Sequence, residues 1–60
     1  MLTKLIKLVI SQNGEPMTED EIWQEFRGTY AKSQVALAIQ EMLLEGHLYY
    51  DVHRKLNLVN

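Results

Sequence analysis

The stretch Ser33–Tyr50, SQVALAIQEMLLEGHLYY, decides the fold of this chain. Spacings of three and four residues place one set of apolar side chains on or beside a single stripe of a helix, namely Ala31, Val35, Ala38, Ile39 and Met42. Gly46 then supplies the residue that most readily adopts the left-handed conformation at the end of a helix. The stretch therefore predicts a helix over about residues 31–45 that runs directly into a strand.

The residues after Gly46 alternate between apolar and polar, which is the pattern of a half-buried strand. Leu48, Tyr50 and Val52 fall on the inward side of this pattern, so that Tyr49 is expected to point outward. A second alternating segment follows at Leu56–Val59. The intervening His53-Arg54-Lys55 lacks an Asn-Gly turn signal, but the two segments still predict a hairpin with its tip at residues 53–55.

Two more helices are predicted upstream of this stretch. Residues 2–12 repeat their apolar positions at the helical period. Thr18 and Glu21 form the T-x-x-E pattern of a capping box, which predicts that a second helix begins there and ends near Arg27-Gly28. Pro16 prevents the first helix from continuing, so Glu15–Met17 is expected to form a short extended piece.

Length and composition limit the possible functions. The chain has 60 residues, no cysteine and a net charge of −2, which predicts one small domain over residues 1–60 without disulfides or thiolate metal sites. No apolar run approaches the roughly 20 residues of a membrane span. No nucleophile–base set, metal-ligand pattern or phosphate loop is present, so we expect no enzyme, cofactor, metal or small-molecule substrate. A cytoplasmic protein is expected, with no membrane association.

The order of helix, short extended piece, helix, helix and hairpin resembles the winged helix-turn-helix family over essentially the whole chain. The resemblance rests on VALAIQEMLLEGHLYY, in which the family's recognition-helix pattern falls on Val35, Ile39, Met42, Gly46 and Leu48. It implies a mainly α fold with a small β-hairpin (α+β), that is, three helices and a C-terminal two-stranded wing. It also implies a DNA-binding protein, acting in transcriptional regulation or replication and associated with the nucleoid. The fold itself hosts several functions, so the outer surface must decide.

In the family's geometry the third helix enters the major groove and the wing touches the backbone or minor groove of double-stranded DNA. Four of the six lysines and arginines flank the turn that leads into this helix or lie at the wing tip, namely Arg27, Lys32, Arg54 and Lys55, whereas most acidic residues lie elsewhere in the sequence. Base and phosphate contacts are therefore expected from Arg27, Thr29, Tyr30, Lys32, Ser33, Gln34, Leu37, Gln40, His53, Arg54 and Lys55. Four cations imply weak binding by one subunit, so a homodimer on two half-sites is expected.

The outer face of the same helix also supports a second interpretation. Leu37 and Leu44 are seven residues apart with Glu41 between them, and a helix that reads a groove has little use for a second exposed leucine or a central carboxylate. These three residues indicate a protein–protein adaptor without DNA binding as the alternative. The sequence leaves open whether the hairpin covers Leu44.

Overall fold

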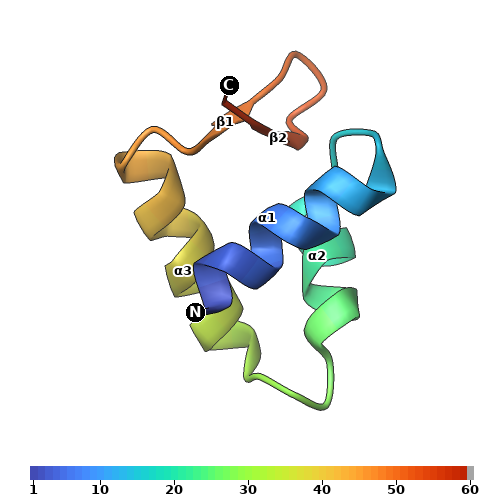
Figure 1. The fold of residues 1–60 in the computed structure, drawn as a ribbon, viewed down its shortest axis with the longest axis vertical. Helices are drawn as coiled ribbons and strands as arrows, with labels where there is room; N and C mark the ends of the chain where they lie inside the picture. The colour runs from blue at the N-terminus through green and yellow to red at the C-terminus, as the bar shows by residue number, and fades with distance from the viewer. Residues whose placement is uncertain (60) are drawn as a thin grey trace.

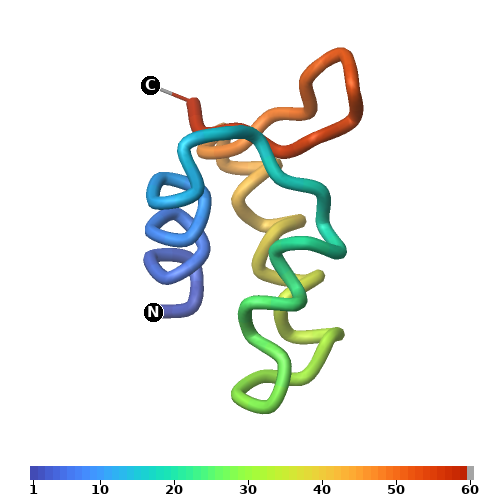
Figure 2. The backbone as a smooth tube through the Cα atoms, turned by 90° about the vertical axis from the view of Figure 1, so that its right-hand side faces the viewer, coloured from blue at the N-terminus to red at the C-terminus, as the bar shows by residue number. Residues whose placement is uncertain are grey.

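The computed structural model describes residues 1–59 of the chain as three helices followed by an antiparallel two-stranded hairpin. The elements are α1 (Leu2–Asn13), α2 (Glu19–Phe26), α3 (Lys32–Leu44), β1 (Leu48–Tyr50) and β2 (Leu56–Leu58). The helices enclose the core, and the hairpin lies across one end of them (Figures 1 and 2). The predicted fold class, mainly helical with a small C-terminal hairpin, is confirmed.

Helix α1 forms because its apolar residues repeat at the helical period and face the other two helices. Ile6 and Ile10 are buried on this face. The helix ends at Gly14, which has a φ of 77° and donates its N–H to the carbonyl of Ile10 at 3.3 Å. A left-handed residue at this position closes the helix and turns the chain toward Pro16.

Helix α2 begins with the capping box that the sequence predicts. Thr18 Oγ1 accepts a hydrogen bond from the Glu21 N–H at 3.1 Å, and Glu21 Oε1 accepts one from the Thr18 N–H at 2.9 Å. This backbone bond to the carboxylate holds the pKa of Glu21 below its usual value. Ile22 and Phe26 are the buried residues of the helix, and Gly28 follows with a φ of 91°.

Helix α3 buries the predicted stripe of Val35, Ala38, Ile39 and Met42. Its C-terminus is a Schellman motif around Gly46 (φ 80°), in which the His47 N–H donates to the Met42 carbonyl at 2.8 Å and the Gly46 N–H to Leu43 at 3.2 Å. The prediction for Ala31 was wrong, because Ala31 is the exposed N-cap and not part of the stripe.

The hairpin pairs Leu48 with Leu58, Tyr49 with Asn57 and Tyr50 with Leu56. Met17 forms an isolated antiparallel bridge to Leu56 on the other side of β2, with the Met17 N–H donating to the Leu56 carbonyl at 3.0 Å. The short extended piece expected at Glu15–Met17 is therefore confirmed at Met17.

The turn of the hairpin is built by Asp51. Its Oδ1 accepts hydrogen bonds from the backbone N–H groups of His53 at 2.8 Å and Lys55 at 2.9 Å, while Arg54 adopts a left-handed φ of 59°. These N–H groups, Lys55 first, hold the pKa of the Asp51 carboxyl below its usual value. An aspartate that binds the backbone of its own turn replaces the missing Asn-Gly signal.

The hairpin is shorter than the alternation pattern predicts. Strand β1 ends at Tyr50, and Val52 lies exposed in the turn. The prediction that Tyr50 points inward also needs correction, because its residue surface is 51% exposed. Tyr50 shares the strand parity of buried Leu48, but it extends past the edge of the core toward the first turn of α2, where it lines a hollow with Glu19.

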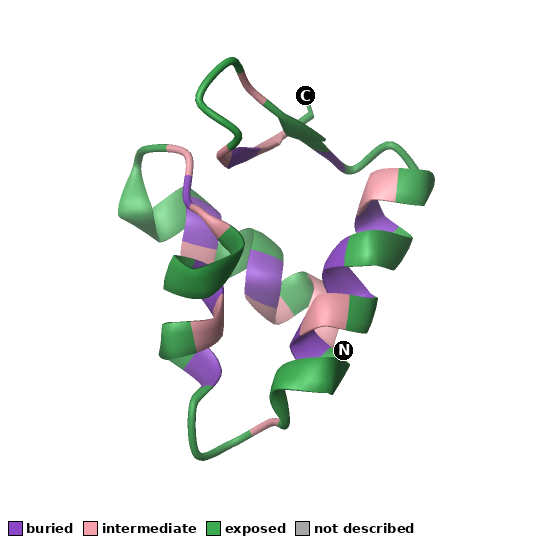
Figure 3. Ribbon diagram, turned by 180° about the vertical axis from the view of Figure 1, so that it is seen from behind, coloured by how far each residue is buried: buried purple, intermediate pink, exposed green. Residues whose placement is uncertain are grey.

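The core fills the space between the three helices and the hairpin. In Figure 3 the buried segments of α3 face those of the other two helices. Its buried members are Ile6, Ile10, Met17, Ile22, Phe26, Val35, Ala38, Ile39, Met42, Leu48 and Leu56. Every element contributes to this one cluster, which fixes how α3 presents its outer face.

Candidate nucleic-acid interface

The part of α3 from Lys32 to Gln40 presents its predicted contact residues to solvent. Lys32, Ser33, Gln34, Leu37 and Gln40 are all exposed, because the buried stripe of the helix lies on its opposite side. The structure therefore brings together, on one helical face, the residue types that donate to and accept from base edges and phosphates.

One of these side chains is partly occupied within the protein. Gln34 Oε1 accepts a hydrogen bond from the Ala31 N–H at 2.9 Å, which satisfies an otherwise unpaired donor at the start of α3. A bidentate contact to adenine requires both the oxygen and the nitrogen of the amide. Gln34 must release this cap to make such a contact, whereas no protein hydrogen bond of Gln40 competes within residues 1–59.

The loop between α2 and α3 carries three predicted phosphate contacts that differ in exposure. Arg27 and Thr29 are exposed. Tyr30 is half-buried, with its ring packed edge-on against Phe26 at a centroid distance of 5.9 Å and an angle of 75°. Tyr30 therefore serves first to close the core at this end, and its expected role as a phosphate contact is confined to the part of the ring that stays exposed.

The wing tip places Arg54 and Lys55 on the side of the molecule where α2 begins. Arg54 lines a hollow of about 460 Å³ together with Glu19 and Tyr50. Lys55 is half-buried, and its charge adds to the lowering of the Glu21 pKa that is caused chiefly by the Thr18 backbone bond. His53 is exposed at the turn.

The first turn of α2 lies between the wing and α3. Lys32 Nζ is 3.9 Å from Asp20 Oδ1, and both side chains are largely exposed, at 69% and 82%. Glu19 lines the wing hollow and also a second hollow of about 120 Å³ that includes Asp20, Trp23 and Lys32. The acidic run that follows Thr18 therefore faces the cations expected to contact phosphate.

This arrangement corrects the argument that the acidic residues are segregated from the cations. Glu19, Asp20 and Glu21 are distant from Lys32 and Arg54 in the sequence. The fold brings that helix start against α3 and the wing. The sequence could have indicated this proximity, because two consecutive helices joined by a short turn pack against each other.

The remaining outer face of α3 is apolar and acidic. Leu37 is 59% exposed and Leu44 is 82% exposed, with exposed Glu41 between them. The hairpin leaves from the end of α3 without covering Leu44. The question that the sequence left open is thus answered, and both leucines are accessible in the structure of residues 1–59.

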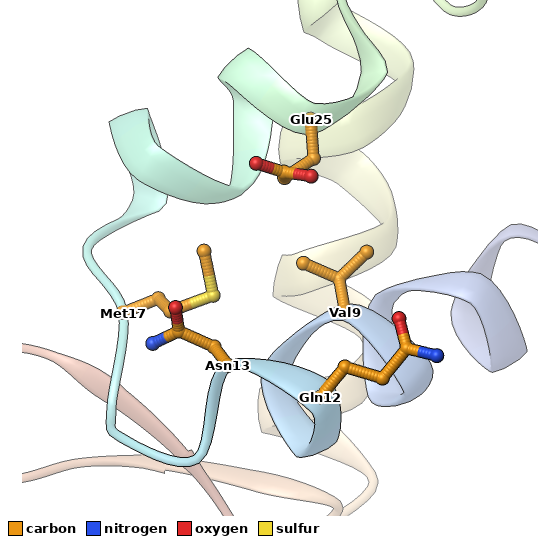
Figure 4. Close-up of a pocket in the computed structure, with 5 residues that line it drawn as sticks. All are labelled: Val9, Gln12, Asn13, Met17 and Glu25. Atoms are coloured by element: carbon orange, nitrogen blue, oxygen red, sulfur yellow. The ribbon is translucent and has the colours of Figure 1, made fainter.

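The described residues contain no group of side chains that could hold a metal ion. No group of three histidine, aspartate or glutamate side chains converges within residues 1–59. A hollow of about 220 Å³ lies between α1 and α2. Figure 4 shows the residues that line it, Val9, Gln12, Asn13, Met17 and Glu25. None of the helices in the described part has the length and apolar character to cross a bilayer.

No protein-family model, curated protein or solved structure matches the chain. Its function must therefore be inferred from its own surface.

Proposed function

We propose that this chain is a small winged-helix DNA-binding protein that regulates transcription or replication at the nucleoid. The observation that carries the proposal is the exposed start of α3, where Lys32 and Ser33 project from a helix fixed by its buried side, with exposed Gln40 two turns further along. In helix-turn-helix proteins this part of the second helix of the motif contacts base edges in the major groove. Arg27 and the wing cation Arg54 then supply phosphate contacts from the two flanking segments.

The acidic first turn of α2 makes the proposed binding weak for one copy. Lys32 must exchange its exposed contact with Asp20 for a phosphate, which costs little because exposed ion pairs contribute only about 0–1 kcal/mol. Glu19 and Asp20 also repel the phosphate backbone as it approaches. Two copies on two half-sites are therefore part of the proposal, since the contacts of both subunits then act on one DNA molecule.

The proposal is tested by titrating the protein against a labelled DNA duplex and following fluorescence anisotropy at about 50 mM and about 200 mM salt. Affinity should fall as salt rises, because phosphate contacts release counterions. Lys32→Gln should weaken binding and reduce the slope of log K against log salt by about 0.9 per subunit. Absence of salt-sensitive binding at micromolar protein contradicts the proposal.

A second function is favoured by one specific observation, the exposure of Leu37 and Leu44. In this alternative, α3 docks on another protein and the chain acts as an adaptor without binding DNA. The distinguishing result is the absence of salt-sensitive DNA binding together with partner capture that Leu37→Asp abolishes. Arg54→Gln should leave that capture unchanged, because the wing tip lies outside the leucine pair.

A further inference from the structure

Helix α1 carries a one-turn cluster of two cations and a leucine on its outer side. Lys4, Lys7 and Leu8 are all exposed, with Leu8 at 51%, while Ile6 and Ile10 face the core. Neither lysine forms an ion pair within residues 1–59. We call Lys4, Lys7 and Leu8 the α1 triad.

The last turn of α3 carries a cluster of the opposite sign. Glu41, Leu44 and Glu45 are exposed, and Leu44 is the most exposed leucine of the chain described in residues 1–59. Glu41 has no cationic partner among the described residues, and Glu45 has only His47 Nε2 at 3.8 Å. We call Glu41, Leu44 and Glu45 the α3 triad.

The two triads are complementary in spacing and in charge. Each occupies positions i, i+3 and i+4 of a helix, so its three side chains lie on one turn of the surface. Each combines one leucine with two like charges, and the signs are opposite. An apolar contact combined with charges of opposite sign on the two surfaces is the composition that specifies a pairing between two helices.

Both triads also carry charges that their own helix disfavours. Lys4 lies in the first turn of α1, which contains no acidic residue, and Glu41 lies in the last turn of α3, which contains no basic one. Each charge therefore has the same sign as the partial charge at its end of the helix dipole. When the start of α1 in one copy contacts the end of α3 in another, Lys4 lies near the negative end of the α3 dipole. Glu41 then lies near the positive end of the α1 dipole.

We propose that a second copy of this chain binds here, with the α1 triad of one protomer seated on the α3 triad of its partner. Pairing α3 with α3 would instead place Glu41 near its own copy, which like-charge repulsion opposes. In a two-fold arrangement the α1 triad of each protomer contacts the α3 triad of the other. The same contact therefore forms twice, and the assembly is closed as a dimer. The contact leaves Lys32, Ser33 and Gln34 at the other end of α3 uncovered.

This inference identifies the surface of the second copy that the proposed function requires. It does not depend on DNA, so its test is performed without DNA. A protein that self-associates through the triads but binds no duplex overturns only the proposed function. Monomeric protein that binds duplex with salt sensitivity overturns the present inference and the pairing of two copies in the proposed function, but leaves the proposed DNA binding intact.

The test uses two charge-reversed variants, Lys4→Glu with Lys7→Glu and Glu41→Lys with Glu45→Lys, followed by sedimentation equilibrium at low salt. The wild-type chain should self-associate with a dissociation constant between about 10 μM and 1 mM, because the contact is small and consists of exposed pairs. Each variant alone should raise this constant at least about tenfold. An equimolar mixture of the two variants should associate again, since each reversed triad then meets its complement.

Folding of the variants is checked independently by thermal unfolding. Lys4→Glu and Glu41→Lys each replace a charge that the helix dipole disfavours with one that it favours. Lys7 and Glu45 are exposed, so neither double variant should unfold at a lower temperature than the wild type. Leu44→Ser provides a second measurement and should also weaken self-association. The inference is overturned by a wild type that stays monomeric at about 1 mM, by variants that associate as the wild type does, or by a mixture that fails to associate.

Discussion

The inner and outer faces of α3 are under different constraints. The inner face is uniform, since Val35, Ile39 and Met42 are all buried in the same core. The outer face changes along the helix, from cationic and polar side chains at Lys32–Gln34 to the leucine and carboxylates at Glu41–Glu45. A uniform face serves one purpose, which is packing. A face that differs between its two ends can serve two, which is why we propose DNA for one end and a second copy for the other.

The largest expected effect comes from Ile39→Ala on the inner face. Ile39 is almost fully buried, so truncation should lower the free energy of unfolding by about 2–5 kcal/mol. Each kcal/mol lowers the melting temperature of a domain of this size by roughly 4–8 °C. Thermal unfolding followed by circular dichroism measures the loss, and Leu37→Ala on the outer face is the matched control. Equal losses in the two variants would show that the two faces do not differ as described.

A smaller effect is expected from Asp20→Asn, which should raise the affinity for DNA and not lower it. Removing this carboxylate frees Lys32 and reduces repulsion of phosphate, so the affinity for duplex DNA should rise a few-fold, by about 0.5–1 kcal/mol. Glu25→Gln is the control, because it changes the charge equally on the same helix but lies in the hollow between α1 and α2 (Figure 4). Anisotropy titrations of both variants at one salt concentration measure the difference. An equal response would mean that only net charge matters.

Leu44→Ser should leave stability almost unchanged. Its side chain is exposed at the end of α3, and exposed substitutions away from caps and cores change the free energy of unfolding by less than about 0.5 kcal/mol. Denaturant unfolding at a protein concentration low enough to keep the chain monomeric measures this value. A loss comparable to that of Ile39→Ala would place Leu44 in the core and remove it from the outer face.

The smallest effect is expected from acid. Asp51 and Glu21 both have pKa values held below normal by backbone hydrogen bonds, first from Lys55 and Thr18 respectively. Their contribution is therefore fully present above the unfolded-state values near 3.8 and 4.5, and it is lost as pH falls through the lower folded-state values. Asp51→Asn keeps an oxygen for the turn but no longer titrates. The free energy of unfolding of this variant should therefore fall less than that of the wild type as the pH drops below about 4. Denaturant unfolding at a series of pH values measures the difference.

The fold was predictable from the sequence where short-range patterns control structure. The capping box at Thr18 and Glu21, the buried stripe of α3 and the stop at Gly46 each depend on residues within a few positions of one another. The turn built by Asp51 was missed because its signal is a side-chain contact to the backbone and not a recognised dipeptide. The exposure of Tyr50 was missed because alternation gives the side of a strand and not where the core ends.

The candidate interface was less predictable, because it depends on which helices lie beside each other. The pair of Lys32 and Asp20 joins two helices, and the hollow shared by Glu19 and Arg54 joins a helix to the hairpin. Charges that are separate in the chain are adjacent in space. A count of cations along the chain therefore leaves out the carboxylates that the fold places beside them.

The bridge between Met17 and Leu56 has a consequence for the order in which this protein folds. Leu56 is fully buried, so the core remains open on one side until the hairpin has been synthesised. The three helices leave the ribosome first, yet they lack Leu48 and Leu56, the two hairpin residues that belong to the buried core. Docking of the hairpin is thus a non-local step that follows helix formation. A chain stalled before Leu56 would expose its apolar interior to chaperones and proteases.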